Sequence, residues 1–171
     1  MRAASTAATP VRVSPRVSVM SLTPAWRRAL PPAARLARRA ALAALDDVGN
    51  GRAIEICLVL ADDATARRLN CTYRGIDKPT NVLAFGGYDK APDGEAAPGD
   101  VVLAHETVAG EARAAGIALA DHVSHLVVHG VLHLLGHDHE RPAEARRMRL
   151  AEVAILAGLG VADPYRRGRR P

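Results

Sequence analysis

The sequence predicts an α+β fold in a single domain, with four strands and four or five helices. Three observations support this prediction. The 171 residues suit one domain, and a hydrophobic fraction of 49% is enough for a core. Short β-branched stretches and longer helical patterns both occur along the chain, without internal repeats. Much of the apolar content is alanine and only 3% is aromatic, which predicts a core of small residues completed by Leu, Val and Ile.

Four strands are predicted where apolar or β-branched residues are bounded by turn residues. The second is an almost continuous apolar run, which is typical of a buried strand. The stretch between the third and fourth strands is polar and rich in turn residues, so we expect a surface loop there. The predicted strands are Arg16–Met20, Ala53–Asp62, Asn81–Gly86 and Asp100–Glu106.

The helices of the first half are predicted from their caps. Thr23 opens a first helical segment, and an alanine-rich helix follows and ends near Leu45. Either Asp62 or Asp63 caps a short helix that continues to Tyr73.

The second half is predicted to be helical after the fourth strand. Glycine marks the ends, because glycine accepts the left-handed conformation of a helix C-cap. Asp121 is the expected N-cap of the second of these helices. The predicted helices run from Glu106 to Gly116, from Asp121 to Gly136 and from Pro142 to about Gly158.

The two ends of the chain are predicted to lie outside the folded domain, which spans residues 16–160. Residues 1–15 are expected to form a disordered basic extension, and residues 161–171 a basic tail. The N-terminus resembles a transit peptide in composition, but its prolines and lack of an amphipathic period favour an extension on a cytoplasmic protein. Apolar runs do not approach the roughly 18 residues of a membrane span, so we expect no membrane partner.

The chain is basic, with a net charge of +5 and a pI near 9.9, and almost all of its positively charged residues are arginines. Guanidinium groups match phosphate oxygens, so this balance favours a nucleic-acid or acidic partner. A GC-rich genome produces the same Ala- and Arg-rich composition, so composition alone leaves both explanations open.

Two cysteines, Cys57 and Cys71, lie in or beside apolar stretches and do not form a CxxC pair. We expect buried free thiols in a reducing compartment. The sequence contains nothing that requires a disulfide.

The stretch HGVLHLLGHDH, from His129 to His139, has the histidine and glycine spacing of the metzincin zinc proteases. Residues four apart share a helix face, so His129 and His133 project together. Gly136 can end the helix, and the chain can then turn His139 toward the same point. Three imidazoles leave a fourth position for water, which is typical of a catalytic zinc site. The sequence therefore predicts one zinc ion per chain, bound by these three histidines.

Other polar residues surround this predicted site. His125 lies one turn before His129 and could be a fourth ligand or a supporting group, whereas the spacing of His137 fits less well. Asp138 could orient a ligand imidazole by accepting its second N–H. Because three ligands and a water complete a tetrahedron, we expect His125 and His137 to be supporting or structural residues.

Gly130 occupies the position where metzincins carry the glutamate that acts as general base. Glycine inside a helix costs about 1 kcal/mol relative to alanine, so we expect substrate or another backbone to approach closely there. Zinc alone can lower the pKa of a bound water to about 7. Hydrolysis is therefore compatible with this sequence, while peptide cleavage is less favoured.

Three segments resemble the YbeY family, bacterial metal-dependent endoribonucleases that mature ribosomal RNA. They are HLVVHGVLHLLGHDH at 125–139, LNCTYRGIDKPTNVLAF at 69–85 and GDVVLAHETV at 99–108. The resemblance reaches from roughly Val17 to Leu156. The sequence departs from the family at His137, where tyrosine is usual, and at Ala84, where serine is common. The first departure leaves the number of imidazole ligands open.

The resemblance implies that His129, His133 and His139 bind zinc and that Arg74 of the YRG segment is functional. It implies a compact α+β domain with a small mixed four-stranded sheet, four to six helices and the zinc site at the end of a central helix. The implied role is maturation of the 16S rRNA 3′ end, with a part in ribosome quality control. The implied partners are ribosomal RNA and the small ribosomal subunit, extending to ribosomal proteins or an assembly GTPase.

Arg74 is expected in a loop beside Gly75. A guanidinium there could hold the scissile phosphate and stabilise its charge in the transition state. Asp77 could instead pair with Arg74 and leave it an ordinary surface charge. Thr80 and Asn81 could simply cap the strand that follows.

We therefore predict a zinc-dependent endoribonuclease that cleaves single-stranded ribosomal RNA, with water or the RNA 2′-OH as nucleophile. A metallopeptidase is the first alternative; the histidine spacing favours it and Gly130 opposes it. The second alternative is a ribosome-assembly factor with structural zinc, which the open fourth position opposes.

Overall fold

Four strands form one mixed sheet in the computed structural model, which describes residues 15–48, 54–86, 99–137 and 141–166. The order is β1-β2-β4-β3; β1, β2 and β4 are parallel, and β3 lies antiparallel to β4 at the edge. This arrangement confirms the predicted α+β class and the mixed sheet. The strands are β1 (Arg16–Ser21), β2 (Glu55–Ala61), β3 (Val82–Gly86) and β4 (Gly99–Ala104).

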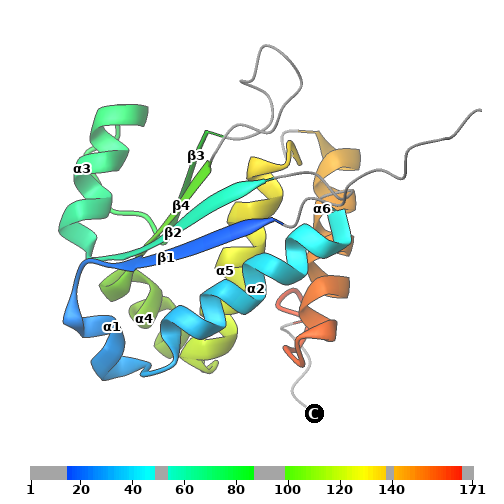
Figure 1. Ribbon diagram of the computed structural model, residues 1–171, viewed down its shortest axis with the longest axis horizontal. Coiled ribbons are helices and arrows are strands. Elements are labelled where there is room, and N and C mark those ends of the chain that lie inside the picture. The colour runs from blue at the N-terminus through cyan, green and yellow to red at the C-terminus, as the bar shows by residue number, and fades with distance from the viewer. Residues whose placement is uncertain (1–14, 49–53, 87–98, 138–140, 167–171) are drawn as a thin grey trace, which may run out of the picture.

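Six helices in the described residues surround this sheet (Figure 1). Helix α3 lies on one side of the sheet, and α2, α5 and α6 lie on the other. The helices are α1 (Pro24–Ala29), α2 (Ala33–Val48), α3 (Asp63–Arg74), α4 (His105–Ala114), α5 (Leu119–Leu134) and α6 (Pro142–Gly158). The alanine-rich helix thus continues one turn beyond its predicted end near Leu45.

The main core lies between the sheet and helices α2 and α5. Alternate residues of β2 point into it, as the two-residue period of a strand requires. Five alanines of α2 lie in this core, and all but Ala33, which is 3% exposed, are at most 1% exposed, which confirms the predicted core of small residues. The other four are Ala37, Ala40, Ala41 and Ala44. A smaller cluster of Ala61, Leu83 and Val102 lies on the opposite face of the sheet.

The junction between β4 and α4 differs from the prediction. The strand ends at Ala104, and His105 and Glu106 belong to the helix. Asp63 explains the early helix start, because its carboxylate accepts hydrogen bonds from the backbone N and the hydroxyl of Thr107, at 2.9 and 2.8 Å. This capping group comes from a distant segment, so local sequence did not reveal it.

The start of α5 also differs from the prediction. The N-cap is Ala118, and Asp121 lies in the first turn of the helix. Asp121 still favours the helix there, because a carboxylate stabilises the positive end of the helix dipole. On α3, by contrast, Asp62 is the N-cap, and its side chain accepts a hydrogen bond from the backbone N of Thr65 at 2.8 Å.

Both cysteines are free thiols, but they are not buried as predicted: Cys57 is half-buried and Cys71 is exposed on α3. Within the described ranges, none of the helices is by itself long and apolar enough to cross a membrane. Helices α4 and α5 meet that criterion only as a pair, which is bent by 119°, and only by length and composition. The predicted N-terminal extension, apart from Pro15, lies outside the described residues, as do 49–53 and 87–98.

Candidate active site

Helix α5 brings His129 and His133 together one turn apart. Their Nε2 atoms lie 3.1 Å from each other. Two nitrogens that each bind one zinc ion at about 2.0–2.1 Å with tetrahedral angles lie about 3.3 Å apart, so this pair fits a shared metal ion. The remainder of α5 is largely buried, and this burial holds both histidines on a rigid element.

The predicted third ligand, His139, and the neighbouring Asp138 lie outside the described residues. Within the described ranges, His, Cys, Asp and Glu side chains form no group of three or more that could hold a metal ion. Gly136 has a φ of +83°, in the left-handed region, and α5 ends just before it. This turn is the feature from which the sequence predicted the return of the chain toward the site.

Glu152 of α6 lies directly behind His129. Its Oε1 atom is 2.7 Å from Nδ1 of His129, and the residue is only 1% exposed. A carboxylate that accepts the Nδ1–H of a histidine fixes the imidazole and directs Nε2 toward a metal, and most metal-binding histidines have such a partner. Sequence reasoning missed Glu152. The available signal was an acidic residue on the buried side of α6, four positions from both Met148 and Leu156.

Tyr165 and His125 complete the hydrogen-bonded group behind His129. The Tyr165 hydroxyl donates to Oε2 of Glu152, and Nε2 of His125 lies 3.5 Å from that hydroxyl. Burial raises the pKa of Glu152, but the hydrogen bonds from His129 and Tyr165 outweigh it, so the net pKa is lowered and the carboxylate is ionised. Burial lowers the pKa of His125, which favours its neutral form.

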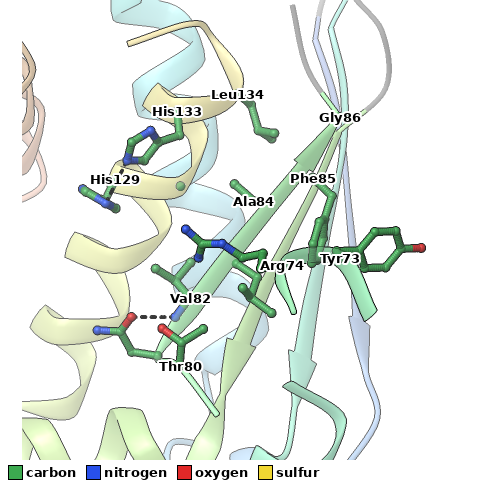
Figure 2. Close-up of a pocket in the computed structure, with 13 residues that line it drawn as sticks. Tyr73, Arg74, Thr80, Val82, Ala84, Phe85, Gly86, His129, His133 and Leu134 are labelled. Atoms are coloured by element: carbon green, nitrogen blue, oxygen red, sulfur yellow. Dashed lines mark hydrogen bonds between the residues drawn. The ribbon is translucent and has the colours of Figure 1, made fainter. Parts of the chain in front are cut away.

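A cleft of about 660 Å³ joins α5 to the edge strand β3 and the end of α3. His129, Gly130 and His133 line one wall, and Arg74 lines the other. Figure 2 shows the Arg74 side chain crossing beside β3, with its guanidinium directed toward the α5 side. His125 and His137 do not line this cleft. The structure therefore unites the predicted arginine with two of the three predicted metal ligands.

Arg74 was predicted to lie in a loop, but it is the last residue of α3. Gly75 ends the helix with a φ of +70°. Asp77 does not pair with Arg74: its carboxylate binds Arg67 in a two-point interaction at 2.6 and 2.7 Å. The side chain of Arg74 is exposed and makes no hydrogen bond or ion pair with any described residue. Its guanidinium donors thus remain available to an anion in the cleft.

Buried hydrogen bonds fix the loop between α3 and β3. Asn70 is 3% exposed, and its Nδ2 donates to the carbonyl of Lys78 at 2.8 Å. Asn81 accepts from the backbone N of Val82 at 2.7 Å through Oδ1, which agrees with its predicted capping role. Its Nδ2 donates to Glu111 of α4. These bonds hold β3 and the end of α3, and hence the base of Arg74, in place relative to the sheet.

Glycine at position 130 was expected to allow the close approach of substrate or of another backbone, and the structure gives a different reason for it. A Cβ atom at this position would lie 2.8 Å from Cγ1 of Val101 and 3.4 Å from Cγ2 of Val82. Side chains of the sheet, rather than a backbone or a substrate, therefore require glycine here. Because Val101 is fully buried, a glutamate at position 130 would not fit without moving β4 or α5.

Comparisons with known proteins identify the family of this chain. The family described as Endoribonuclease YbeY matches residues 29–160. A protein named Endoribonuclease YbeY from Paramagnetospirillum magneticum is 53% identical over 83% of this chain and 90% of its own length. A protein of the same name from Rhodospirillum rubrum is 49% identical over 91% of this chain and 84% of its own length.

A solved structure supports the fold independently. The solution structure of TM1509 from Thermotoga maritima superimposes with a TM-score of 0.52 at 19% sequence identity, covering 88% of this chain and 99% of that one. Similarity at this level concerns the fold alone. The sequence comparisons are stronger, because about half of the residues agree over most of both chains. By these matches, and by the motifs that line its cleft, the chain belongs to the YbeY family of endoribonucleases.

Proposed function

We propose that this endoribonuclease uses one zinc ion, held by His129, His133 and His139, to cleave single-stranded RNA. Relatives that are 42–53% identical are named endoribonucleases, so RNA hydrolysis follows from family membership. The zinc requirement and the preference for single strands are the proposed parts.

The observation that carries the proposal is the cleft itself. Two histidines of α5 and an arginine of α3, far apart in the sequence, line the same cavity. Imidazole nitrogens suit zinc, and an unpaired guanidinium suits a phosphate. A hydrolase acting on a phosphodiester needs both kinds of group, one to activate and one to neutralise charge.

The roles of this chain's residues follow from their positions. Arg74 binds a non-bridging oxygen of the scissile phosphate and offsets the charge that builds up there. Glu152 holds the His129 imidazole in the orientation that a ligand needs. Zinc, when bound, supplies Lewis acidity and lowers the pKa of water. No carboxylate lines the described part of the cleft, so we assign no protein side chain as general base.

Peptide cleavage is disfavoured by the same geometry. The metzincin mechanism places a glutamate where this chain has Gly130, and Val101 occupies the space that such a side chain would need. A purely structural zinc is also disfavoured, because both histidines line an open cleft and do not close off a buried site.

The cellular role is proposed from the resemblance of the motifs. We infer that the substrate is the 3′ end of 16S rRNA in the cytoplasm and that the enzyme contributes to ribosome quality control. The small ribosomal subunit is the proposed partner, together with ribosomal proteins or an assembly GTPase. The basic, arginine-rich composition of the chain supports an RNA partner.

One assay separates the alternatives. The full chain, loaded with zinc or stripped by a chelator, is incubated with a single-stranded RNA, the matching duplex and an unstructured peptide. We expect cleavage of the single strand only, its loss on stripping and its recovery with zinc. Peptide cleavage by the loaded protein would favour the metallopeptidase. A zinc-loaded, folded protein that cuts none of the three substrates would favour the assembly factor.

A further inference from the structure

The segment that follows α6 folds back along that helix. Gly160, with a φ of +78°, reverses the chain, and the backbone N of Val161 donates to the carbonyl of Leu156 at 2.9 Å. Asp163 then accepts from the backbone N of Tyr165 at 2.8 Å through Oδ1. These bonds return Tyr165 to the level of Glu152. Residues 161–166 were predicted as part of the basic tail, and the structure places an aromatic side chain of this stretch against the domain.

Tyr165 contacts Glu152 and His125 of the group behind His129, and its ring also contacts Arg149. Its hydroxyl donates to Oε2 of Glu152. Its ring stands edge-on to that of His125, with the centroids 5.7 Å apart, and the guanidinium of Arg149 lies 4.3 Å from its centroid. The ring is thus held on two sides, and its hydroxyl is directed at the Glu152 carboxylate.

The two oxygens of Glu152 have different partners. Oε1 accepts from His129, and Oε2 accepts from Tyr165. The terminal torsion of a glutamate is broad and soft, so a bond to one oxygen alone leaves the carboxylate plane free to rock. A second bond on the other oxygen fixes this plane. The direction of the His129 ring therefore depends on both hydrogen bonds.

We propose that Tyr165 is a positioning residue of the metal site, which acts through Glu152 to orient the imidazole of His129. The inference rests on the proposed role of His129 as a metal ligand. The segment after α6 thus has a function in the site, although Tyr165 neither lines the cleft nor reaches the metal position. Loss of a single hydroxyl should therefore weaken metal binding without unfolding the protein.

The test is the zinc affinity of the full-length Tyr165→Phe variant, measured by competition with a chromogenic chelator. Removing a partner behind a ligand typically costs about 10- to 100-fold in metal affinity; Tyr165 is one bond further away, so we expect a loss of about 3- to 10-fold. The metal-free variant should still fold, with a melting temperature only modestly below that of the metal-free wild type, because the ring remains and only one hydrogen bond to the buried carboxylate is lost. A zinc affinity equal to that of the wild type would overturn the proposal.

Two further variants separate positioning from packing. Tyr165→Leu removes both ring and hydroxyl; if only this change lowered the affinity, the ring would matter and the hydroxyl would not. Tyr73→Phe removes a tyrosine hydroxyl that makes no hydrogen bond with any described residue; although Tyr73 lines the cleft, zinc affinity should not change.

A double-mutant comparison tests the proposed route through Glu152. In a Glu152→Gln background, Tyr165→Phe should cause little further loss, whereas independent effects would add and contradict this route. His133→Ala is measured in parallel. If that variant retained full zinc binding, the proposed metal site itself would be wrong, which is a different result from an unaltered Tyr165→Phe variant.

Discussion

The two walls of the cleft are built differently. On the α5 wall, His129 is hydrogen-bonded to Glu152, which is 1% exposed, and Glu152 is hydrogen-bonded to Tyr165. On the opposite wall, Arg74 is exposed at the last position of α3 and makes no hydrogen bond with any described residue. A metal ligand must be oriented before the ion arrives, whereas a phosphate-binding arginine needs its donors unoccupied until substrate arrives. The difference predicts separate defects, in metal binding on one wall and in catalysis on the other.

The largest effect is expected for His133→Ala. Loss of one of three ligands should abolish stoichiometric zinc binding, which metal analysis of the purified protein would show. Comparable variants of His125 and His137 should retain more zinc than His139→Ala, because three ligands and a water complete the coordination. Equal metal loss from His137→Ala and His139→Ala would overturn that assignment.

On the other wall, Arg74→Ala should leave fold and zinc content unchanged but lower the rate of RNA cleavage. Loss of an electrostatic group of this kind typically costs about 10²–10³-fold in rate. Arg74→Lys should recover only part of the activity, because lysine cannot make a two-point contact with phosphate. Full activity of a zinc-loaded Arg74→Ala variant would return Arg74 to the status of an ordinary surface charge.

Glu152→Gln tests whether the α5 wall depends on the group behind it. The variant keeps the size of the side chain but removes its charge, so zinc affinity should fall by about 10- to 100-fold. Glu111→Gln is a matched control: Glu111 also binds a histidine, His122, at 2.8 Å, but at a different place. Equal zinc affinity in the two variants would contradict the role of Glu152.

The smallest effect is expected for Gly130→Ala, which tests the contact between α5 and the sheet. Overpacking typically costs about 1–3 kcal/mol, and the higher helix propensity of alanine offsets about 1 kcal/mol of it. We expect a net loss in the free energy of unfolding, measured by denaturant titration. Gly110→Ala on α4 is the control: its Cβ would meet no atom within 4 Å, so this variant should be more stable than the wild type. Equal stabilisation by both changes would show that Val101 does not restrict position 130.

The pairing of the two α5 histidines could be predicted because their spacing is local. His129 and His133 share a face of any helix that contains both, and a glycine three residues later accepts a left-handed turn. The four strands were also predictable in number and order, since each depends on short-range patterns of apolar and turn residues, whereas the described residues form six helices and not the four or five predicted. One error occurred where a distant group decided the outcome, since Asp63 of α3 caps the start of α4.

By itself, therefore, the sequence determined the α+β class and the α5 histidine pair and, through its resemblance to a family, gave the expectation that Arg74 is functional. Only the tertiary structure decided which other side chains lie opposite these residues and which lie behind them. Arg74 lines the same cleft as the two histidines, beside the edge strand β3, and the loop that follows α3 is held by Asn70 and Asn81. Glu152 and Tyr165 come behind His129 because α6 and the segment after it pack against α5. Such contacts depend on the packing of whole elements, and no short-range periodicity records that packing.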